Sequence, residues 1–332
     1  MRFGITTMAQ EPPERFRKLV ETAEAGGCDY LWVCDSSLHA RDVYSYLTLA
    51  ASCTNRLKLG PNCTHPYTRH PAINLNAMAT INEISGGRAI IAVAAGDRPV
   101  MELGYRMARV AVVREMIELI RALQEGGPVS IDGPTFKLAD ATLSSAFPSP
   151  LPVYMAASGP RMLQLAGELT DGVLFLSGAN LPCIRYALEQ IETGARGAGR
   201  SAQTLDIGCT VYGSLTDDEE QARAECRPMA AWFPQTAPQY AEIVGVPPET
   251  IEKIKKAYAG GHFDAATEAL THVTDDMIDA FTIAGPAHVW IDRLRQIRAA
   301  GLEHINIFLL TGDKLGMVER LVRDVLPKVR EA

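Results

Sequence analysis

Two aspartates follow short apolar runs of this chain and are the first candidates for ligand binding or proton transfer. Asp35 comes directly after the apolar run 30–34, and Asp97 follows the small residues 94–96. A carboxylate at the end of a buried strand is costly unless it is paired or hydrogen-bonded. Asp35 could therefore accept a hydrogen bond from a ligand ring, or it could cap a helix or pair with Arg69. The small residues before Asp97 leave room for a planar ring against the backbone.

The segment Ala157-Ser158-Gly159-Pro160 is a candidate phosphate site. It joins an apolar run to an amphipathic helical pattern, and Pro160 suits the first position of that helix. A helix N-terminus offers free N–H groups and the positive end of the helix dipole, and Gly159 would let an anion approach closely. The same residues would also serve as a plain helix cap, so the motif alone leaves both interpretations open.

Three histidines, His39, His65 and His70, fall near the same predicted strand ends. Their spacing matches no metal-binding motif, and the chain contains no H-E-x-x-H sequence. It also contains no G-x-S-x-G sequence, and no serine has a convincing histidine and aspartate partner. The pattern therefore argues against a metal site and against a serine hydrolase.

The composition argues against several classes of partner. The 332 residues include 32 Lys and Arg against 39 Asp and Glu, a formal net charge of −7, without a basic stretch interleaved with aromatic residues. Nucleic-acid binding needs a cationic surface that releases counterions, so we expect no nucleic-acid partner. No apolar run approaches the roughly twenty residues of a membrane helix. The seven dispersed cysteines include no C-x-x-C pair, which favours reduced thiols in a cytoplasmic protein. With nucleic acid and membrane set aside, we expect the partner to be a small-molecule substrate.

The elements that must position the candidate residues alternate from end to end of the chain. Apolar runs predict eight strands, at 2–6, 30–34, 58–59, 88–94, 153–156, 173–176, 206–213 and 304–309. Helical patterns alternate with them, at 13–25, 43–53, 71–84, 109–124, 160–169, 181–198, 286–300 and 315–329. A polar excursion over 125–150 contains a small predicted hairpin over 129–138.

Strands that alternate with helices predict parallel βαβ units with the helices outside. An open doubly wound sheet normally has a glycine-rich loop after its first strand, and here residues 7–10 contain no glycine. We therefore predict a single α/β domain over 1–332, a closed (β/α)8 TIM barrel. A helical insertion over about 217–279 would follow the seventh strand, either lining a substrate pocket or forming a peripheral cap. The candidate residues fall at the carboxyl ends of the strands, where barrel enzymes carry their sites.

Several segments, in order and spacing, resemble one family. They are Arg41-Asp42-Val43-Tyr44, Lys58-Leu59-Gly60-Pro61, Pro66-Tyr67-Thr68-Arg69-His70-Pro71, Ile84-Ser85-Gly86-Gly87-Arg88, Gly96-Asp97, Gly159-Pro160 and Thr170-Asp171-Gly172-Val173. Together they resemble the bacterial-luciferase-like superfamily and, within it, the F420-dependent methylenetetrahydromethanopterin reductases. The similarity spans the chain and includes the segment 280–285 before the last barrel helix.

This resemblance implies a deazaflavin F420 ring, or a flavin ring, at the carboxyl end of the barrel. It implies a non-prolyl cis peptide behind the ring, which by position joins Asn62 and Cys63. The residues implied at the polar edge of the ring are Asp35, Thr64, His65 and the backbone of Gly96 and Asp97. Those implied around the phosphate are Ala157, Ser158, Gly159, Ser177 and Gly178. The implied reaction is hydride transfer to an electrophilic carbon, for the reductases the methylene bridge of a tetrahydropterin.

The chain departs from the family pattern at three places. Thr6 stands where the reductases have an acidic residue proposed as proton donor, and a hydroxyl is a poor general acid unless it is relayed. Ser36 follows Asp35 where many F420 relatives have histidine, and His39 could reach the same space. Asn62-Cys63 replaces the usual small pair at the cis bond.

Asp97, Thr6 and His39 are accordingly the candidate catalytic residues. Two alternatives stay open: an FMN-dependent monooxygenase on the same barrel, and a barrel that binds a cofactor without turnover. Relatives are commonly oligomers, so we expect a homo-oligomer.

Overall fold

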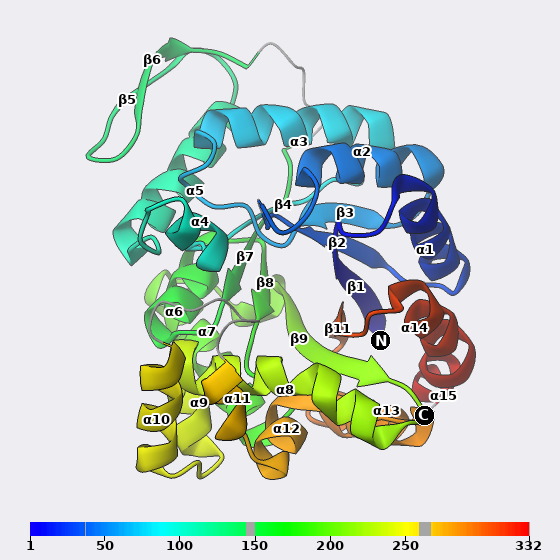
Figure 1. Cartoon of the computed structure of the whole chain (residues 1–332). Coiled ribbons are helices and arrows are strands. Elements are labelled where there is room, and N and C mark those ends of the chain that lie inside the picture. Colours follow the sequence, from blue (N-terminus) through cyan, green and yellow to red (C-terminus); the bar gives the residue numbers. More distant parts are fainter. Residues whose placement is uncertain (37, 144–149, 259–266, 332) are drawn as a thin grey trace.

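The computed structural model describes residues 1–36, 38–143, 150–258 and 267–331. Among these residues, eight parallel strands form a central barrel surrounded by helices (Figure 1). The strands are β1 (Arg2–Met8), β2 (Tyr30–Cys34), β3 (Lys58–Pro61), β4 (Ile91–Val93), β7 (Val153–Ala157), β8 (Gly172–Phe175), β9 (Asp206–Leu215) and β11 (His304–Leu309). Their order is β3-β2-β1-β11-β9-β8-β7-β4, and the parallel bridges Leu59–Ala89 and Thr64–Val93 close the ring. The predicted TIM barrel is confirmed.

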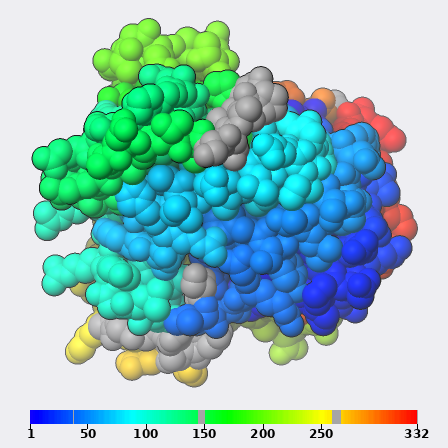
Figure 2. All heavy atoms as spheres, turned by 90° about the horizontal axis from the view of Figure 1, so that it is seen from above, coloured from blue at the N-terminus to red at the C-terminus, as the bar shows by residue number. Residues whose placement is uncertain are grey.

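The outer helices form because each has one apolar face toward the barrel. In α1 (Pro13–Ala25) the buried side chains are Phe16, Leu19, Val20 and Ala23, which recur at helical spacing. The other helices of this layer are α2 (Val43–Cys53), α3 (Pro71–Ser85), α5 (Val110–Gln124), α6 (Pro160–Leu169), α7 (Leu181–Gly197) and α13 (Ala287–Ala299). Figure 2 shows the opposite ends of the chain side by side, with red C-terminal residues at the edge of the molecule beside the dark-blue N-terminal residues.

The last helix differs from its prediction. Instead of one helix over 315–329, the chain forms α14 (Lys314–Arg320), a short π-helical segment (Leu321–Val325) and α15 (Leu326–Arg330). Pro327 has no N–H to donate, so the regular hydrogen-bond ladder of an α-helix cannot continue through it. The three segments still bury one apolar side against the barrel and against α1.

Aromatic side chains fill the interior of the barrel. Side chains alternate along a strand, so Leu31 and Val33 of β2 face the helices, whereas Tyr30 and Trp32 face inward. Space for the indole ring comes from glycine on the neighbouring strand. A β-carbon at Gly60 would lie 2.6 Å from a ring carbon of Trp32. The interior is therefore a packed core, and ligands must bind at its end.

A polar cluster closes the amino end of the barrel. The Asp206 carboxylate accepts hydrogen bonds from the hydroxyls of Tyr30 and Tyr154, at 2.6 Å each, and pairs with His304 at 3.0 Å and Arg2 at 2.9 Å. Burial alone would raise the pKa of Asp206, but these partners, His304 first, hold it below its usual range. This cluster lies at the starts of the strands, opposite the end where barrel enzymes bind ligands.

The insertion after β9 is helical, as predicted. It contains α8 (Glu219–Thr236), α9 (Pro238–Ile243), α10 (Pro248–Tyr258), α11 (Thr267–Thr271) and α12 (Asp275–Phe281). These helices lie together on one side of the barrel in Figure 1 and share an apolar core, in which the rings of Phe233 and Phe281 stack at 4.3 Å. Residues 259–266 of the insertion and 144–149 of the polar excursion lie outside the described residues.

Three short elements complete the fold. The predicted hairpin is present as β5 (Val129–Asp132) and β6 (Lys137–Ala141), and it projects from the barrel in Figure 1. The sequence analysis did not predict α4 (Arg98–Glu102) or β10 (Thr282–Gly285), which pairs with β9, because four or five residues show too little periodicity. In the described ranges we find no helix that is both long and apolar enough to span a membrane.

Candidate active site

The end of β3 carries the backbone feature expected at the mouth of the barrel. The peptide bond between Asn62 and Cys63 is cis, so the expectation for this position is confirmed. Asn62 Nδ2 donates a hydrogen bond to Thr6 Oγ1 at 3.1 Å, and Cys63 packs against the inner aromatic cluster. Two consecutive side chains thus face the inside of the barrel, where an alternating strand would present only one.

Thr6 does not have the role that its position in the first strand suggested. Its side chain is completely buried, donates a hydrogen bond to Asn306 Oδ1 at 2.8 Å and accepts one from Asn62. Asn306 in turn donates to Thr210 Oγ1 at 3.2 Å. The hydroxyl proton of Thr6 is therefore committed to an interior chain of hydrogen bonds. We correct its assignment from a catalytic residue to a residue that holds Asn62.

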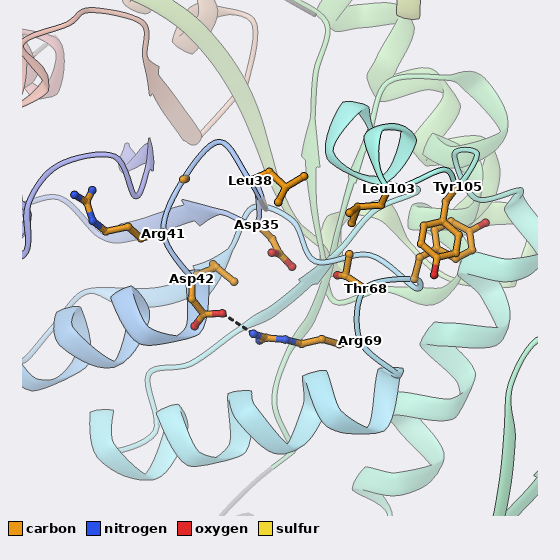
Figure 3. A pocket seen from close by; sticks show the side chains of 11 residues that line it. Asp35, Leu38, Arg41, Asp42, Thr68, Arg69, Leu103 and Tyr105 are labelled. Atoms are coloured by element: carbon orange, nitrogen blue, oxygen red, sulfur yellow. Dashed lines mark hydrogen bonds and ion pairs between the residues drawn. The ribbon is translucent and has the colours of Figure 1, made fainter. Parts of the chain in front are cut away.

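A cavity of about 580 Å³ opens between the loops that follow β2, β3 and β4. Asp35, at the end of β2, lines it, and Figure 3 shows the side chains of Asp35, Leu38 and Leu103 near one another. Burial raises the pKa of Asp35, while the Thr64 hydroxyl and the Arg69 guanidinium act in the opposite direction. A half-buried carboxyl of this kind can accept or donate a hydrogen bond to a ligand in the cavity.

The remaining lining residues were not assigned to the site from the sequence. They are Leu38, Ala40, Arg41, Asp42, Val43, Tyr67, Thr68, Arg69, Leu103 and Tyr105. Arg69 pairs with Asp42 at 2.5 Å (Figure 3), and the rings of Tyr67 and Tyr105 stack with their centroids 5.2 Å apart. Their periodic signal was weak, because most of them lie on loops. Two signals could have indicated them: the position of these loops after predicted strands, and the two quoted family segments, 41–44 and 66–71, that contain six of them.

Thr64 and His65 lie directly behind the cavity. Thr64 pairs with Ala92 of the neighbouring strand through its backbone, and its hydroxyl lies 3.1 Å from that of Tyr44. His65 is 2% exposed, and burial lowers its pKa to about 4. Its ring is therefore neutral near pH 7 and contacts the backbone N–H of Tyr67 and the hydroxyl of Thr68. Thr68 lines the cavity, so His65 supports that wall.

Gly96 and Asp97 connect the barrel to the insertion. Gly96 has φ +80°, and a β-carbon there would lie 2.9 Å from Val100, so both the backbone angle and the space favour glycine. Asp97 Oδ2 accepts a hydrogen bond from Trp232 Nε1 of α8 at 3.1 Å. The contact places the insertion at the mouth of the barrel, beside the residues expected to hold a ring.

His39 lies apart from this arrangement. Its Nε2 is 2.5 Å from a carboxylate oxygen of Glu102, on α4, and His39 is not among the residues that line the cavity. Its chain neighbours Leu38 and Ala40 do line the cavity, so His39 lies beside the wall rather than in it. Its assignment as a catalytic residue stays a prediction.

The predicted phosphate residues fall into two groups. Ala157 ends β7, and Gly159 is the N-cap residue of α6, which has no side-chain cap. The carbonyl of Ser158 accepts hydrogen bonds from Gln239 and Tyr240 of the insertion, at 3.0 Å each. Ser177 and Gly178 are instead buried, and a β-carbon at Gly178 would lie 2.8 Å from the Phe281 backbone. Of the two groups, only the N-terminus of α6 is open to an anion.

Metal ligation finds no support in the same region. The described residues include no group of three or more His, Cys, Asp or Glu side chains that could hold a metal ion. All seven cysteines are free, and burial raises the pKa of Cys34 to about 12. Among the described residues, the mouth of the barrel therefore offers hydrogen-bonding groups and a cavity rather than a cluster of metal ligands.

Comparison with known proteins identifies the family. The model of the luciferase-like monooxygenase family matches residues 1–304. The 5,10-methylenetetrahydromethanopterin reductase of Methanopyrus kandleri is 35% identical, with 99% of both chains covered, and that of Archaeoglobus fulgidus is 34% identical, with 99% of this chain and 100% of the relative covered. The solved structure of the coenzyme F420 dependent tetrahydromethanopterin reductase from Methanopyrus kandleri superposes with a TM-score of 0.83 at 33% identity, with 98% of both chains covered. The match to the family model and the full-length similarity to these reductases show that this chain belongs to the luciferase-like monooxygenase family.

Proposed function

We propose that this protein is an F420-dependent oxidoreductase that transfers a hydride between the deazaflavin ring and an electrophilic carbon. The observation that carries the proposal is the full-length likeness to the reductases, at 34% to 35% identity over 99% of this chain. An F420-dependent glucose-6-phosphate dehydrogenase from Beutenbergia cavernae is also similar over 99% of this chain, at 28% identity. Relatives with two different acceptors thus share the same cofactor.

The residues at the mouth fit such a cofactor. Gly96 and Ala157 are small residues at strand ends that leave room for a planar ring, and Asp35 and Asp97 could serve as polar partners at its edge. The first N–H groups of α6 have no side-chain cap, and a β-carbon at Gly159 would meet no atom within 4 Å. Free N–H groups facing open space at a helix N-terminus suit a phosphate.

For the acceptor, we propose the methylene bridge of a tetrahydropterin, which hydride transfer converts to a methyl group. Bound F420 would supply the hydride. The task of the protein is to hold ring and acceptor carbon in contact and to exclude water from them. The cavity beside Asp35 supports this proposal, since it offers room for a ligand next to the expected position of the ring.

The test is a titration of the apo-protein with F420 and, separately, with FMN, followed by quenching of tryptophan fluorescence. Binding of F420 with reduction of a methylene-tetrahydropterin is the expected result. Preference for FMN with oxygen uptake would overturn the proposal in favour of a monooxygenase. Tight F420 binding without hydride transfer to any acceptor would leave a cofactor-binding barrel.

A further inference from the structure

The charged side chains that line the cavity differ in how they are engaged. Asp42 pairs with Arg69 at 2.5 Å, and the Arg41 guanidinium donates to three backbone carbonyls of the loop that follows β1. Asp35 lines the cavity at the end of β2, is half-buried and forms no ion pair with a described residue. Among the described residues, its carboxyl is therefore the charged group of the cavity that is left for a ligand.

The burial of Asp35 makes such a partner valuable. Burial raises the pKa of Asp35, and the Thr64 hydroxyl and the Arg69 charge offset this effect only in part. A carboxylate that has lost water on one side is costly unless hydrogen-bond donors replace that water. Hydrogen bonds to a charged group are about twice as strong as those between neutral groups, so donors on a ligand would recover the cost. The carboxylate thus suits a ligand that carries N–H groups.

Two aromatic rings form a second part of the cavity wall. The rings of Tyr67 and Tyr105 are parallel to within 2°, with their centroids 5.2 Å apart. Tyr105 is 48% exposed, and neither hydroxyl makes a hydrogen bond to a described residue. A stacked pair of rings has an outer face on which a further flat ring can stack, whatever polar groups that ring carries. This part of the wall therefore favours a planar ligand.

Backbone contacts hold the aromatic wall in place. The N–H of Tyr67 donates to His65 Nδ1 at 3.4 Å, and the hydroxyl of Thr68, which also lines the cavity, lies 3.3 Å from His65 Nε2. The N–H of Tyr105 donates to the Val100 carbonyl at 3.0 Å. A ligand therefore meets a wall that is ordered before it binds, which lowers the entropic cost of binding.

A flat ring with two neighbouring N–H donors matches both parts of the wall. The cavity of about 580 Å³ is within the size range of small-molecule sites, roughly 300–1,000 Å³. The pyrimidine half of a pterin carries a 2-amino group beside a ring N–H, and these two donors point the same way. Two parallel N–H groups fit the two oxygens of a carboxylate in the manner of an arginine side chain.

We propose that this cavity binds the pterin ring of the acceptor, with Asp35 as the specificity-determining residue that accepts hydrogen bonds from the 2-amino group and the adjacent ring N–H. Tyr67 and Tyr105 form the stacking wall beside it (Figure 3). This rests on the proposed function. It also divides the two carboxyls of the mouth between the ligands: Asp35 serves the acceptor, and Asp97 remains for the edge of the cofactor ring.

The first experiment compares two flat ligands that differ at the group facing Asp35. Pterin carries the 2-amino group, whereas lumazine has a carbonyl oxygen there, which would meet the carboxylate without a proton between them. Dissociation constants are measured by calorimetry with and without saturating F420. The wild type should bind pterin roughly tenfold to a hundredfold more tightly than lumazine, as expected for a hydrogen bond to a charged group. Asp35→Asn can turn its amide N–H toward the lumazine oxygen, so this preference should disappear or reverse.

The aromatic wall has its own pair of variants. Tyr105→Phe keeps the ring and should bind both ligands as the wild type does. Tyr105→Ala removes the ring and should weaken pterin and lumazine by the same factor, roughly tenfold, because stacking is indifferent to the 2-substituent. The dissociation constant of F420 should change little in all three variants. Tyr105 is exposed on a loop, so its variants test the proposal even if Asp35→Asn is unstable.

Three results would overturn the proposal. They are an equal preference for pterin in the wild type and Asp35→Asn, an unchanged affinity in Tyr105→Ala, and a wild type that binds neither ligand. A loss of F420 affinity in Asp35→Asn as large as the loss of pterin affinity would also overturn it, because Asp35 would then belong to the cofactor ring. A wild type that selects pterin through Asp35 but does not bind F420 would instead overturn the proposed function.

Discussion

Replacing Thr6 by valine removes one hydroxyl from the barrel interior and nearly keeps the shape of the side chain. The Thr6 hydroxyl is the donor to Asn306 Oδ1, which is itself completely buried, and the acceptor for Asn62 Nδ2, which is half-buried. A buried polar atom that loses its partner costs about 1–3 kcal/mol. The Asn62 side chain can turn toward the open mouth, so its lost hydrogen bond adds less to this cost. We therefore expect Thr6→Val to lower the free energy of unfolding by about 2–4 kcal/mol.

The matched control is Thr6→Ser, which keeps both hydrogen bonds and loses one methyl group, a cost of about 1 kcal/mol. Urea unfolding of the apo-proteins, followed by tryptophan fluorescence, measures both variants. The reasoning is refuted if the valine variant is no less stable than the serine variant. Because the Thr6 proton is already used inside the barrel, the pH dependence of turnover in Thr6→Val should match that of the wild type. A shifted profile would return Thr6 to the catalytic residues.

Three further predictions concern the mouth of the barrel. His65 has its pKa lowered from 6.5 to about 4 by burial, so its contribution to stability is complete above about pH 6.5 and is lost as the pH falls to about 4. The loss amounts to about 3 kcal/mol. Urea midpoints measured across this pH range should therefore fall with falling pH in the wild type and fall less steeply in His65→Asn. An equal pH dependence in both proteins would contradict the burial argument. Gly159→Val should leave the unfolding midpoint unchanged, because the added β-carbon meets no atom within 4 Å. The same variant should bind F420 more weakly in a fluorescence titration. Wild-type affinity would remove α6 from the phosphate site. Trp232→Phe removes the hydrogen bond to Asp97 and should speed proteolysis of the insertion relative to the barrel. Asp97→Asn keeps an acceptor oxygen, so its proteolysis should be closer to that of the wild type. Identical proteolysis in all three proteins would show that this contact does not hold the insertion.

The barrel could be read from the sequence because its signals are local. The strands are short apolar runs buried on both faces, and the helices have apolar residues at helical spacing, as with Phe16, Leu19 and Val20 of α1. Such patterns need no knowledge of distant residues. The strand ends, and with them Asp35 and Asp97, could therefore be located before the fold was known.

The resemblance added what local patterns do not contain. It placed the cis bond between Asn62 and Cys63 and the cofactor at the mouth of the barrel. It also gave Thr6, His39, Ser177 and Gly178 to the site, and in the structure Thr6, Ser177 and Gly178 are buried.

Only the tertiary structure decided what each polar group can do. Thr6 and Asn306 are 300 residues apart, and their hydrogen bond exists because β1 and β11 are neighbours in the closed barrel. The hydrogen bond from Trp232 to Asp97 likewise joins residues 135 positions apart, and it connects the insertion to the mouth of the barrel. The donor or acceptor role of a hydroxyl depends on every partner around it, and those partners come from different strands and helices. The sequence thus determined at which strand ends the polar groups of the site lie, and the closure of the barrel determined which of them are engaged in hydrogen bonds with one another.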